Sequence, residues 1–309
     1  MTVEVSLEQA EWMVGQAGFS GVVSVHPLSG GWDNTNLRLD LDGGTSLVLK
    51  IWEAQKSLDD AQTVIQRHIW IEKHGVPTAV PMMLESGGRF AVRNGVAWTL
   101  LPYVRGGHLD SDSASLKSLG AVMARLHEAP PAECFPRDYR MGWSLFERMY
   151  ALADESGEWS DLLVALREES GGLRERIPDN LPQGILHGDL FPDNVLGDGE
   201  IAAILDLEEA WFGPRAFDLV MAFVGFGWDA GQPVEGRWNA LLSGYESVRS
   251  LTESERAALP DLHRYATLSI VAWRYWKHVM SEPDEALEDR YLEMVDRLGI
   301  EFDFMEEFD

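Results

Sequence analysis

The stretch that decides the fold runs Gly184-Ile185-Leu186-His187-Gly188-Asp189-Leu190-Phe191-Pro192-Asp193-Asn194-Val195-Leu196. An apolar segment leads into His-Gly-Asp, an asparagine stands five positions after the aspartate, and a second apolar segment follows. Short apolar runs that are bounded by turn residues are typical of buried strands. The sequence therefore predicts two short strands joined by a polar loop, and this loop contains Asp189 and Asn194.

A second carboxylate follows seventeen positions after Asp189, in Ile204-Leu205-Asp206-Leu207-Glu208. An aspartate at the end of an apolar strand is usually a turn residue, but its combination with His-x-Asp-x-x-x-x-Asn is much rarer. Phosphoryl transfer needs a carboxylate that accepts the proton of the attacking hydroxyl, and it needs oxygen ligands for magnesium. The pattern therefore predicts a kinase with Asp189 as base and with Asn194 and Asp206 as magnesium ligands.

Three neighbours of these residues are assigned supporting roles. His187 is grouped with the catalytic residues because its side chain can brace the loop through the backbone. Asp193 and Glu208 are predicted to contact the substrate, and Glu208 can also add a second carboxylate to the metal site.

A glycine-containing polar stretch at 29–36 joins two segments that are predicted to be strands. Glycines let backbone amides approach phosphate oxygens, although such loops are often ordinary hairpin turns. The residues predicted to contact the nucleotide here are Ser29, Gly30, Gly31 and Asn34. Lys50 directly follows the apolar run at 47–49, and its ammonium is predicted to pair with the α- and β-phosphates. The order of loop, strand and lysine before the His-x-Asp stretch favours both assignments.

Hydrophobic periodicity divides the chain into a strand-rich part and a helical part. The strand-rich part has expected strands at 22–28, 36–41, 45–52, 89–93 and 96–101, and expected helices at 6–16 and 58–74. The later part has expected helices at 113–127, 143–152, 161–174, 237–249, 254–280 and 284–298, and short strands only between 184 and 205. We therefore predict an α+β fold of two lobes, with a nucleotide-binding β-rich domain at 1–101 and a helical catalytic and substrate-binding domain at 102–309.

Composition excludes several classes of function. The chain has 25 basic and 51 acidic residues, and its net charge of −26 opposes binding to nucleic acid and to anionic membranes. The acidic residues are spread along the chain, which favours a solvated acidic surface over a funnel for a cationic substrate. The first residues lack a signal peptide's basic region and the longest apolar run, 219–228, is too short for a bilayer, so we expect a cytoplasmic protein without membrane contact. The single cysteine, Cys134, excludes an intrachain disulfide.

The order of these motifs resembles the aminoglycoside phosphotransferase and choline kinase superfamily, which is related to the protein kinases. The resemblance covers nearly the whole chain and is most specific at 186–196 and 204–219, where Gly213-Pro214 and Asp218-Leu219 follow Asp206. It implies a protein-kinase-like fold with a five-stranded ATP lobe and a helical substrate lobe, and it implies ATP and Mg²⁺ as cofactors. It also implies a hinge at 100–104 whose Leu101 and Tyr103 contact adenine, and a structural role for Asp218.

Within the superfamily, three stretches are similar to bacterial homoserine kinases. These are 30–36 ending in Asn-Thr-Asn, the run 187–196, and the late helix Trp273-Arg274-Tyr275-Trp276. The implied acceptor is a small-molecule hydroxyl, L-homoserine as the first choice. Because homoserine carries a carboxylate, an arginine is expected to bind it. Arg274 is the first candidate and Arg140 is the second.

The lysine partner departs from the family pattern. Relatives carry a glutamate on the first long helix that pairs with the strand lysine, but the helix at 58–74 has Val64 at that position. The candidates to replace it are Glu53, Gln62 and Gln66.

Other functions of the same superfamily remain open. Choline, ethanolamine and aminoglycoside kinases and stress-response protein kinases are alternatives, and the acidic charge fits cationic substrates. Five late tryptophans have the chemistry to surround a quaternary ammonium, although core packing explains them more simply. They are Trp143, Trp211, Trp228, Trp273 and Trp276. A pseudokinase that only binds nucleotide is disfavoured because Lys50, Asp189, Asn194 and Asp206 are all present.

Overall fold

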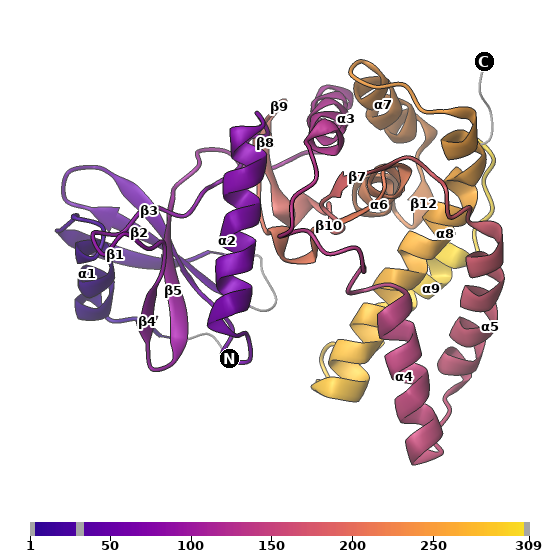
Figure 1. Cartoon of the computed structure of the whole chain (residues 1–309), viewed down its shortest axis with the longest axis horizontal. Helices are drawn as coiled ribbons and strands as arrows, with labels where there is room; N and C mark the ends of the chain where they lie inside the picture. The colour runs from indigo at the N-terminus through magenta and orange to yellow at the C-terminus, as the bar shows by residue number, and fades with distance from the viewer. Residues whose placement is uncertain (1–3, 29–33, 306–309) are drawn as a thin grey trace. The chain divides into compact units, whose positions relative to one another are not determined.

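The computed structural model of the chain describes residues 4–28 and 34–305. These residues form two compact units, and Figure 1 labels their helices and strands. The first unit comprises Met1–Leu109 and Val195–Glu208, and the second comprises Asp110–Asn194 and Glu209–Asp309. The sequence predicted one domain boundary, at residue 101. In the structure the chain passes between the two units three times, after Leu109, Asn194 and Glu208.

The first unit contains a five-stranded antiparallel sheet. Its order is β1-β2-β3-β5-β4, formed by β1 (Val22–Pro27), β2 (Thr35–Leu41), β3 (Ser46–Ile51), β4 (Ala91–Arg93) and β5 (Val96–Pro102). Alternation in β2 and β3 buries Leu39 and Leu49, and helix α1 (Leu7–Gly15) adds Met13 and Val14 to the same core. The sheet and the flanking helices confirm the predicted α+β class and the five strands that the resemblance implied.

Local signals fixed the ends of these elements. Helix α1 begins at a capping box in which Ser6 and Gln9 bond reciprocally, and α2 (Leu58–Lys73) begins at an equivalent box of Ser57 and Asp60. The β4–β5 turn places Asn94 and Gly95 at φ values of 52° and 79°. These positive values are the geometry that an Asn-Gly hairpin turn requires.

A smaller sheet completes the first unit. It has the order β6-β8-β9, with β6 (Gly107–His108), β8 (Val195–Asp198) and β9 (Glu200–Ile204). The sequence predicted β8 and β9 within the helical half. The structure joins them to the first unit because β8 pairs with β6 and because Ile204 bridges to Thr78 beyond α2.

The second unit is mainly helical. Its helices are α3 (Ser113–Glu128), α4 (Trp143–Ser156), α5 (Asp161–Arg176), α6 (Ala216–Phe226), α7 (Glu235–Glu246), α8 (Glu253–Tyr275) and α9 (Leu292–Leu298). Two short ladders join them, β7 (Gln183–Leu186) with β10 (Trp211–Pro214) and β11 (Trp228–Asp229) with β12 (Gln232–Pro233). Helices α3 and α7 pack closely, because a Cβ at Gly120 or Gly244 would collide with the backbone of the other helix.

Three expectations for this unit were incomplete or wrong. Helix α6, which carries Asp218, was missed because nearly all of its residues are buried, so it has no polar face to produce a helical period. The expected helix at 254–280 is α8 followed by a π-helical turn at Trp276–Ser281. The expected helix at 284–298 is wrong in its first half, where Glu288–Tyr291 form a 3₁₀ turn before α9.

Candidate active site

A buried carboxylate fixes the start of the loop that was predicted to be catalytic. Asp218 of α6 is fully buried and accepts hydrogen bonds from the backbone amides of His187 at 2.6 Å and Gly188 at 2.9 Å. The Nε2 of His127 lies 3.2 Å from Asp218 Oδ2, and the Nδ1 of His127 lies 2.8 Å from the Tyr245 hydroxyl. Burial lowers the pKa of His127, so its neutral ring can donate to Asp218 and accept from Tyr245.

The backbone of Gly188 is held from its other side. The Tyr139 hydroxyl donates to Gly188 O at 2.6 Å, and burial raises the pKa of Tyr139 well above its usual value, so the donor keeps its proton. Gly188 has a φ of +80°, and a Cβ there would come within 2.7 Å of the Glu209 carbonyl oxygen. Only glycine fits this turn.

The loop brings Asp189 and Asn194 together. The Asn194 Nδ2 donates to Asp189 O at 2.9 Å and to Asp189 Oδ2 at 3.1 Å, across the 3₁₀ turn Pro192–Asn194. The amide oxygen of Asn194 is therefore the atom suited to a metal. His187 is fully buried and its Nδ1 accepts from the Asp189 amide at 3.2 Å, which braces the loop and gives no support to direct contact with a substrate.

In the first unit, Lys50 has two carboxylate neighbours. Its Nζ lies 2.8 Å from Glu208 Oε1 and 3.5 Å from Asp206 Oδ1, and 4.5 Å from the centre of the Trp52 ring. The acidic partner of Lys50 is thus Glu208, which had been assigned to the substrate. Of the three proposed replacements, Gln62 and Gln66 are exposed, and the backbone amide of Glu53 donates to Asn34 beside Glu208.

Glu208 also binds residues on either side of Lys50. Its Oε1 accepts from Asn34 Nδ2 at 2.6 Å, and its Oε2 forms an ion pair with Lys56. Asn34 in turn accepts from the Glu53 amide at 3.0 Å. Asn34 is the part of the predicted phosphate loop that the structure describes, and Ser29, Gly30 and Gly31 lie outside the described residues.

The turn that carries Asp206 and Glu208 is anchored by α2. Arg67 Nη1 donates to Leu207 O at 2.8 Å and to Glu208 O at 3.0 Å. Thr78 donates to Ile204 O at 2.7 Å, just before Asp206. Asp206 itself has a φ of 53°, which is uncommon for a residue with a side chain and is often found at functional positions. Helix α2 therefore contributes an arginine to this turn, whereas the superfamily pattern would have it contribute a glutamate to Lys50.

The predicted hinge residues lie at the end of the large sheet. Leu101 is in β5 opposite Val48 of β3, and Tyr103 follows the strand. The guanidinium of Arg38 lies 4.6 Å from the centre of the Tyr103 ring. The adenine contacts assigned to Leu101 and Tyr103 stay predictions.

The arginines chosen for the substrate are both engaged. Arg274 has a side chain only 9% exposed, and it donates to Glu293 at 3.0 Å and to Arg290 O at 2.9 Å. Arg140 forms a two-point ion pair with Glu209 and keeps 56% of its side chain exposed. Because its side chain is buried and paired, Arg274 is poorly placed to contact the substrate directly.

A third arginine, Arg290, contacts Arg274 through its backbone oxygen and was not suggested by the sequence. The pKa of Arg290 is lowered from its usual value, first because burial removes solvent and second because Arg274 repels it, while Glu293 and Asp193 act in the opposite direction. Burial also lowers the pKa of His278, and repulsion from Lys277, Arg290 and Arg274 adds to that effect. We call Arg274, Lys277 and Arg290 the cationic cluster.

The late tryptophans do not form an open box for a cation. A cation of the protein already lies over three of the rings, with Arg148 at 4.0 Å from Trp276, Lys277 at 5.8 Å from Trp273 and Arg297 at 4.9 Å from Trp228. Trp143 stacks on Tyr265 at 4.0 Å, and Trp211 stacks on Tyr139 at 5.2 Å. These contacts support the packing explanation.

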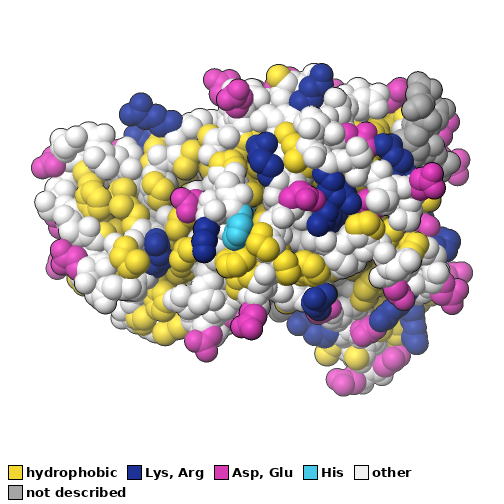
Figure 2. All heavy atoms as spheres, turned by 45° about the horizontal axis from the view of Figure 1, so that its top comes forward, with side chains coloured by type: hydrophobic (Ala, Val, Ile, Leu, Met, Phe, Trp, Pro, Cys, Tyr) yellow, Lys and Arg dark blue, Asp and Glu magenta, His cyan; other side chains and the backbone are white. Residues whose placement is uncertain are grey.

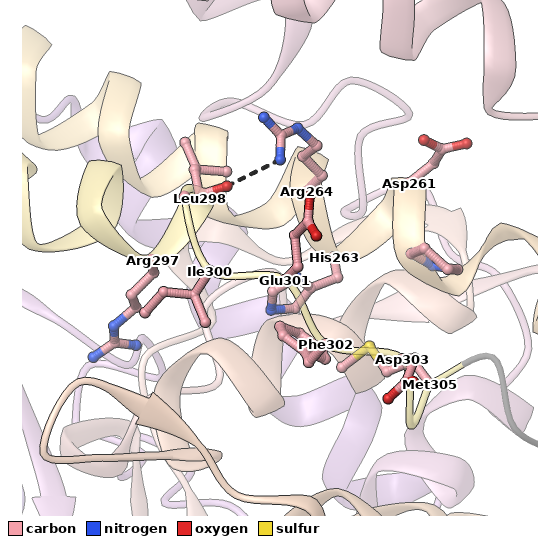
Figure 3. A pocket seen from close by; sticks show the side chains of 12 residues that line it. Asp261, His263, Arg264, Arg297, Leu298, Ile300, Glu301, Phe302, Asp303 and Met305 are labelled. Atoms are coloured by element: carbon pink, nitrogen blue, oxygen red, sulfur yellow. Dashed lines mark hydrogen bonds between the residues drawn. The ribbon is translucent and has the colours of Figure 1, made fainter.

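A separate cavity of about 750 Å³ lies between α8 and the segment at 297–305. Figure 3 shows His263 and Arg264 on one side of it, Phe302 across from them, and the hydrogen bond of 3.1 Å from Arg264 to Leu298 O. Burial lowers the pKa of His263 to about 3. None of the predicted site residues lines this cavity.

Charge and membrane features are consistent with the composition. On the face drawn in Figure 2, acidic and basic side chains are interspersed and form no single acidic patch. Within the residues that the structure describes, no helix is long and apolar enough to cross a membrane. The same part of the chain has no group of three or more His, Cys, Asp or Glu side chains arranged for a metal.

Known proteins are similar to this chain over most of its length. The model of the phosphotransferase enzyme family (APH) matches residues 24–251. The homoserine kinase of Phenylobacterium zucineum (strain HLK1) is 29% identical over 80% of this chain and 77% of its own length. The homoserine kinase of Beijerinckia indica subsp. indica is 30% identical over 84% of each chain.

A solved structure agrees with the fold. An amicoumacin kinase in complex with AMP-PNP, Ca²⁺ and Ami superposes with a TM-score of 0.67 at 18% identity, over 88% of this chain and 87% of that one. The family match covers more than half of the chain. This chain therefore belongs to the phosphotransferase enzyme family and is an ATP-dependent kinase that acts on a hydroxyl of a small molecule.

Proposed function

We propose that the chain phosphorylates the hydroxyl of a small amino acid, with L-homoserine as the first candidate. The observation that carries this proposal is the similarity over most of the chain to two relatives named homoserine kinase. The cationic cluster is the candidate for the carboxylate contact, because Arg274 donates to Arg290 O at 2.9 Å and Asp193 of the loop acts on the pKa of Arg290. In a chain of net charge −26, these three cations favour an anionic ligand, although Asp284 and Glu293 offset part of their charge. The cations and rings of the protein that already pack on the late tryptophans argue against a choline box there.

The residues of the loop supply the chemistry in this proposal. Asp189 accepts the proton of the acceptor hydroxyl as its oxygen attacks the γ-phosphorus, and the bond from that phosphorus to the β,γ-bridging oxygen breaks. The amide oxygen of Asn194 and the carboxylate of Asp206 are hard oxygen donors that fit Mg²⁺. When bound, the ion neutralises charge that develops on the phosphates. Lys50 pairs with phosphate oxygens, and Asp218 keeps the loop in place.

A matched pair of acceptors tests the substrate class. L-Homoserine and 3-aminopropan-1-ol differ only in the α-carboxylate, so their kcat/KM ratio measures recognition of that group. We expect homoserine to be favoured at least roughly 100-fold, because a site built for a charged group is left unpaired by the analogue. ADP release would be measured with both, and with choline, ethanolamine and kanamycin. Equal or better turnover of any acceptor without a carboxylate would refute the amino acid proposal.

Variants of the cationic cluster locate the recognition. Arg290→Met is expected to raise KM for homoserine roughly 10- to 100-fold and to leave KM for ATP unchanged, since only the carboxylate contact is lost. Arg125→Met removes an exposed arginine of α3 in the same unit and serves as the control. An unchanged homoserine KM in Arg290→Met would remove this arginine from the site. Magnesium-dependent stabilisation by ATP without turnover of any acceptor would instead indicate a pseudokinase.

A further inference from the structure

Two lysines share one carboxylate in the first unit. The sequence contains five lysines, and Lys50 and Lys56 both form ion pairs with Glu208. The side chains of the two lysines are 11% and 13% exposed and that of Glu208 is 8% exposed, so all three are withdrawn from solvent. Burying charge is costly unless it is paired, so each lysine needs an anion at this position.

The donors around Glu208 form a pattern that also suits phosphate. Two ammonium groups and the Asn34 amide converge on its two oxygens. Phosphate oxygens accept the same bonds from lysine and amide groups. Lys50 comes from a strand and Lys56 from the segment between β3 and α2, so the two cations approach the carboxylate from different elements.

We propose that Lys56 is a second phosphate-binding lysine and that Glu208 holds the place of the nucleotide phosphates until the nucleotide binds. The proposal rests on the nucleotide site proposed above. When ATP arrives, its phosphates replace the Glu208 carboxylate on Lys50 and Lys56. The side chain of Glu208 is thereby released from both lysines. Glu208 is then a competitor of the nucleotide in the absence of metal.

Removing the competitor gives the sharpest test. Glu208→Gln keeps the size of the side chain and removes its charge, so metal-free AMP-PNP is expected to bind this variant roughly tenfold more tightly than the wild type. Binding would be measured by calorimetry in EDTA, which reports affinity without turnover. If Glu208 only orients Lys50, the variant would bind equally or more weakly, and the exchange would be refuted.

Removing the second lysine tests its contact with phosphate. Lys56→Met is expected to weaken AMP-PNP binding roughly 10- to 100-fold, ADP binding less, and adenosine binding not at all. Lys73→Met, at the exposed end of α2 in the same unit, is the control and should bind all three as the wild type does. Equal losses for adenosine and AMP-PNP would show a structural role for Lys56 and would overturn the proposal. Adenosine binding also shows whether each variant is folded.

Binding of AMP-PNP to the wild type distinguishes a failure of the proposed kinase function from a failure of the proposed exchange. Wild-type protein that binds no AMP-PNP, with or without magnesium, would refute the proposed kinase function itself. Wild-type protein that binds AMP-PNP, while Glu208→Gln and Lys56→Met leave its affinity unchanged, would refute only the exchange.

Discussion

The two units hold their functional residues by different forces. In the first unit, Lys50, Lys56 and Asn34 gather around Glu208 through ion pairs and one amide contact. In the second, Asp218 holds the loop before Asp189 through backbone amides in a fully buried setting. An ion pair can exchange its anion for another, but a buried amide has no alternative partner. The comparison indicates an adaptable lysine site in one unit and, in the other, a fixed loop that carries the proposed base Asp189.

The largest expected effect is the fall in kcat when the proposed base, Asp189, is replaced. Asp189→Asn preserves the shape of the side chain but removes the base, so kcat should fall roughly 10²- to 10⁴-fold. Affinity for AMP-PNP should stay within about twofold, because the lysines that are proposed to hold phosphate belong to the other unit. Steady-state kinetics and calorimetry measure the two quantities. Near-normal turnover would show that another group accepts the proton.

Removing the carboxylate beneath the loop is expected to have the next largest effect. Asp218→Ala leaves the amides of His187 and Gly188 without an acceptor, which should cost about 3 kcal/mol or more in the free energy of unfolding. Urea denaturation followed by tryptophan fluorescence measures the loss. Asp110→Ala removes an exposed aspartate of the same unit and should change little. A small loss for Asp218→Ala would contradict the fixed-loop side of the comparison.

Acid should lower the stability of the second unit because His263 is buried there. The pKa of His263 is lowered to about 3 from 6.5, so below pH 6.5 the unfolded chain binds a proton that the folded chain excludes. Its contribution to stability is complete above pH 6.5 and is lost as the pH falls toward 3, by about 1.4 kcal/mol per pH unit. His263→Phe should therefore flatten the fall in unfolding free energy between pH 6 and pH 4. An equally steep fall in the variant would contradict this origin.

The smallest expected effect comes from replacing Arg67, which anchors the turn that carries Glu208. Arg67→Met removes the donor to Leu207 O and Glu208 O, and should cost about 1–2 kcal/mol of unfolding free energy. It should also weaken AMP-PNP binding a few-fold, because the turn that carries Glu208 loses its support. Gln66→Met introduces the same side chain at an exposed neighbour on α2 and is the matched control. Unchanged binding would mean that the turn keeps its shape without Arg67.

Local chemistry explains what the sequence predicted well. Capping boxes at Ser6 and Ser57, the Asn94-Gly95 turn and the alternation in β2 and β3 act over a few residues, so their elements were predicted from the sequence. The conjunction around Asp189 and Asn194 was readable for the same reason, because both residues lie on one short loop. The α+β class followed from these local elements.

Contacts between distant residues explain what the sequence did not predict. Glu208 reaches Lys50 across 158 positions, and no spacing rule ties a carboxylate after β9 to a lysine in β3. Arg290 belongs to a 3₁₀ turn outside any motif, and only its contact with Arg274 and the effect of Asp193 on its pKa link it to the candidate site. Helix α6 was missed for the opposite reason, since complete burial erased its periodicity.

The close approach of α3 and α7 at Gly120 and Gly244 has a consequence for evolutionary drift. Helix α3 ends near His127 and α7 carries Tyr245, and these two side chains form a chain of contacts that reaches Asp218. A methyl group at either glycine would push the helices apart and disturb that chain. Gly120 and Gly244 have no reactive side chain, yet almost no replacement of either should be tolerated in descendants that keep the activity.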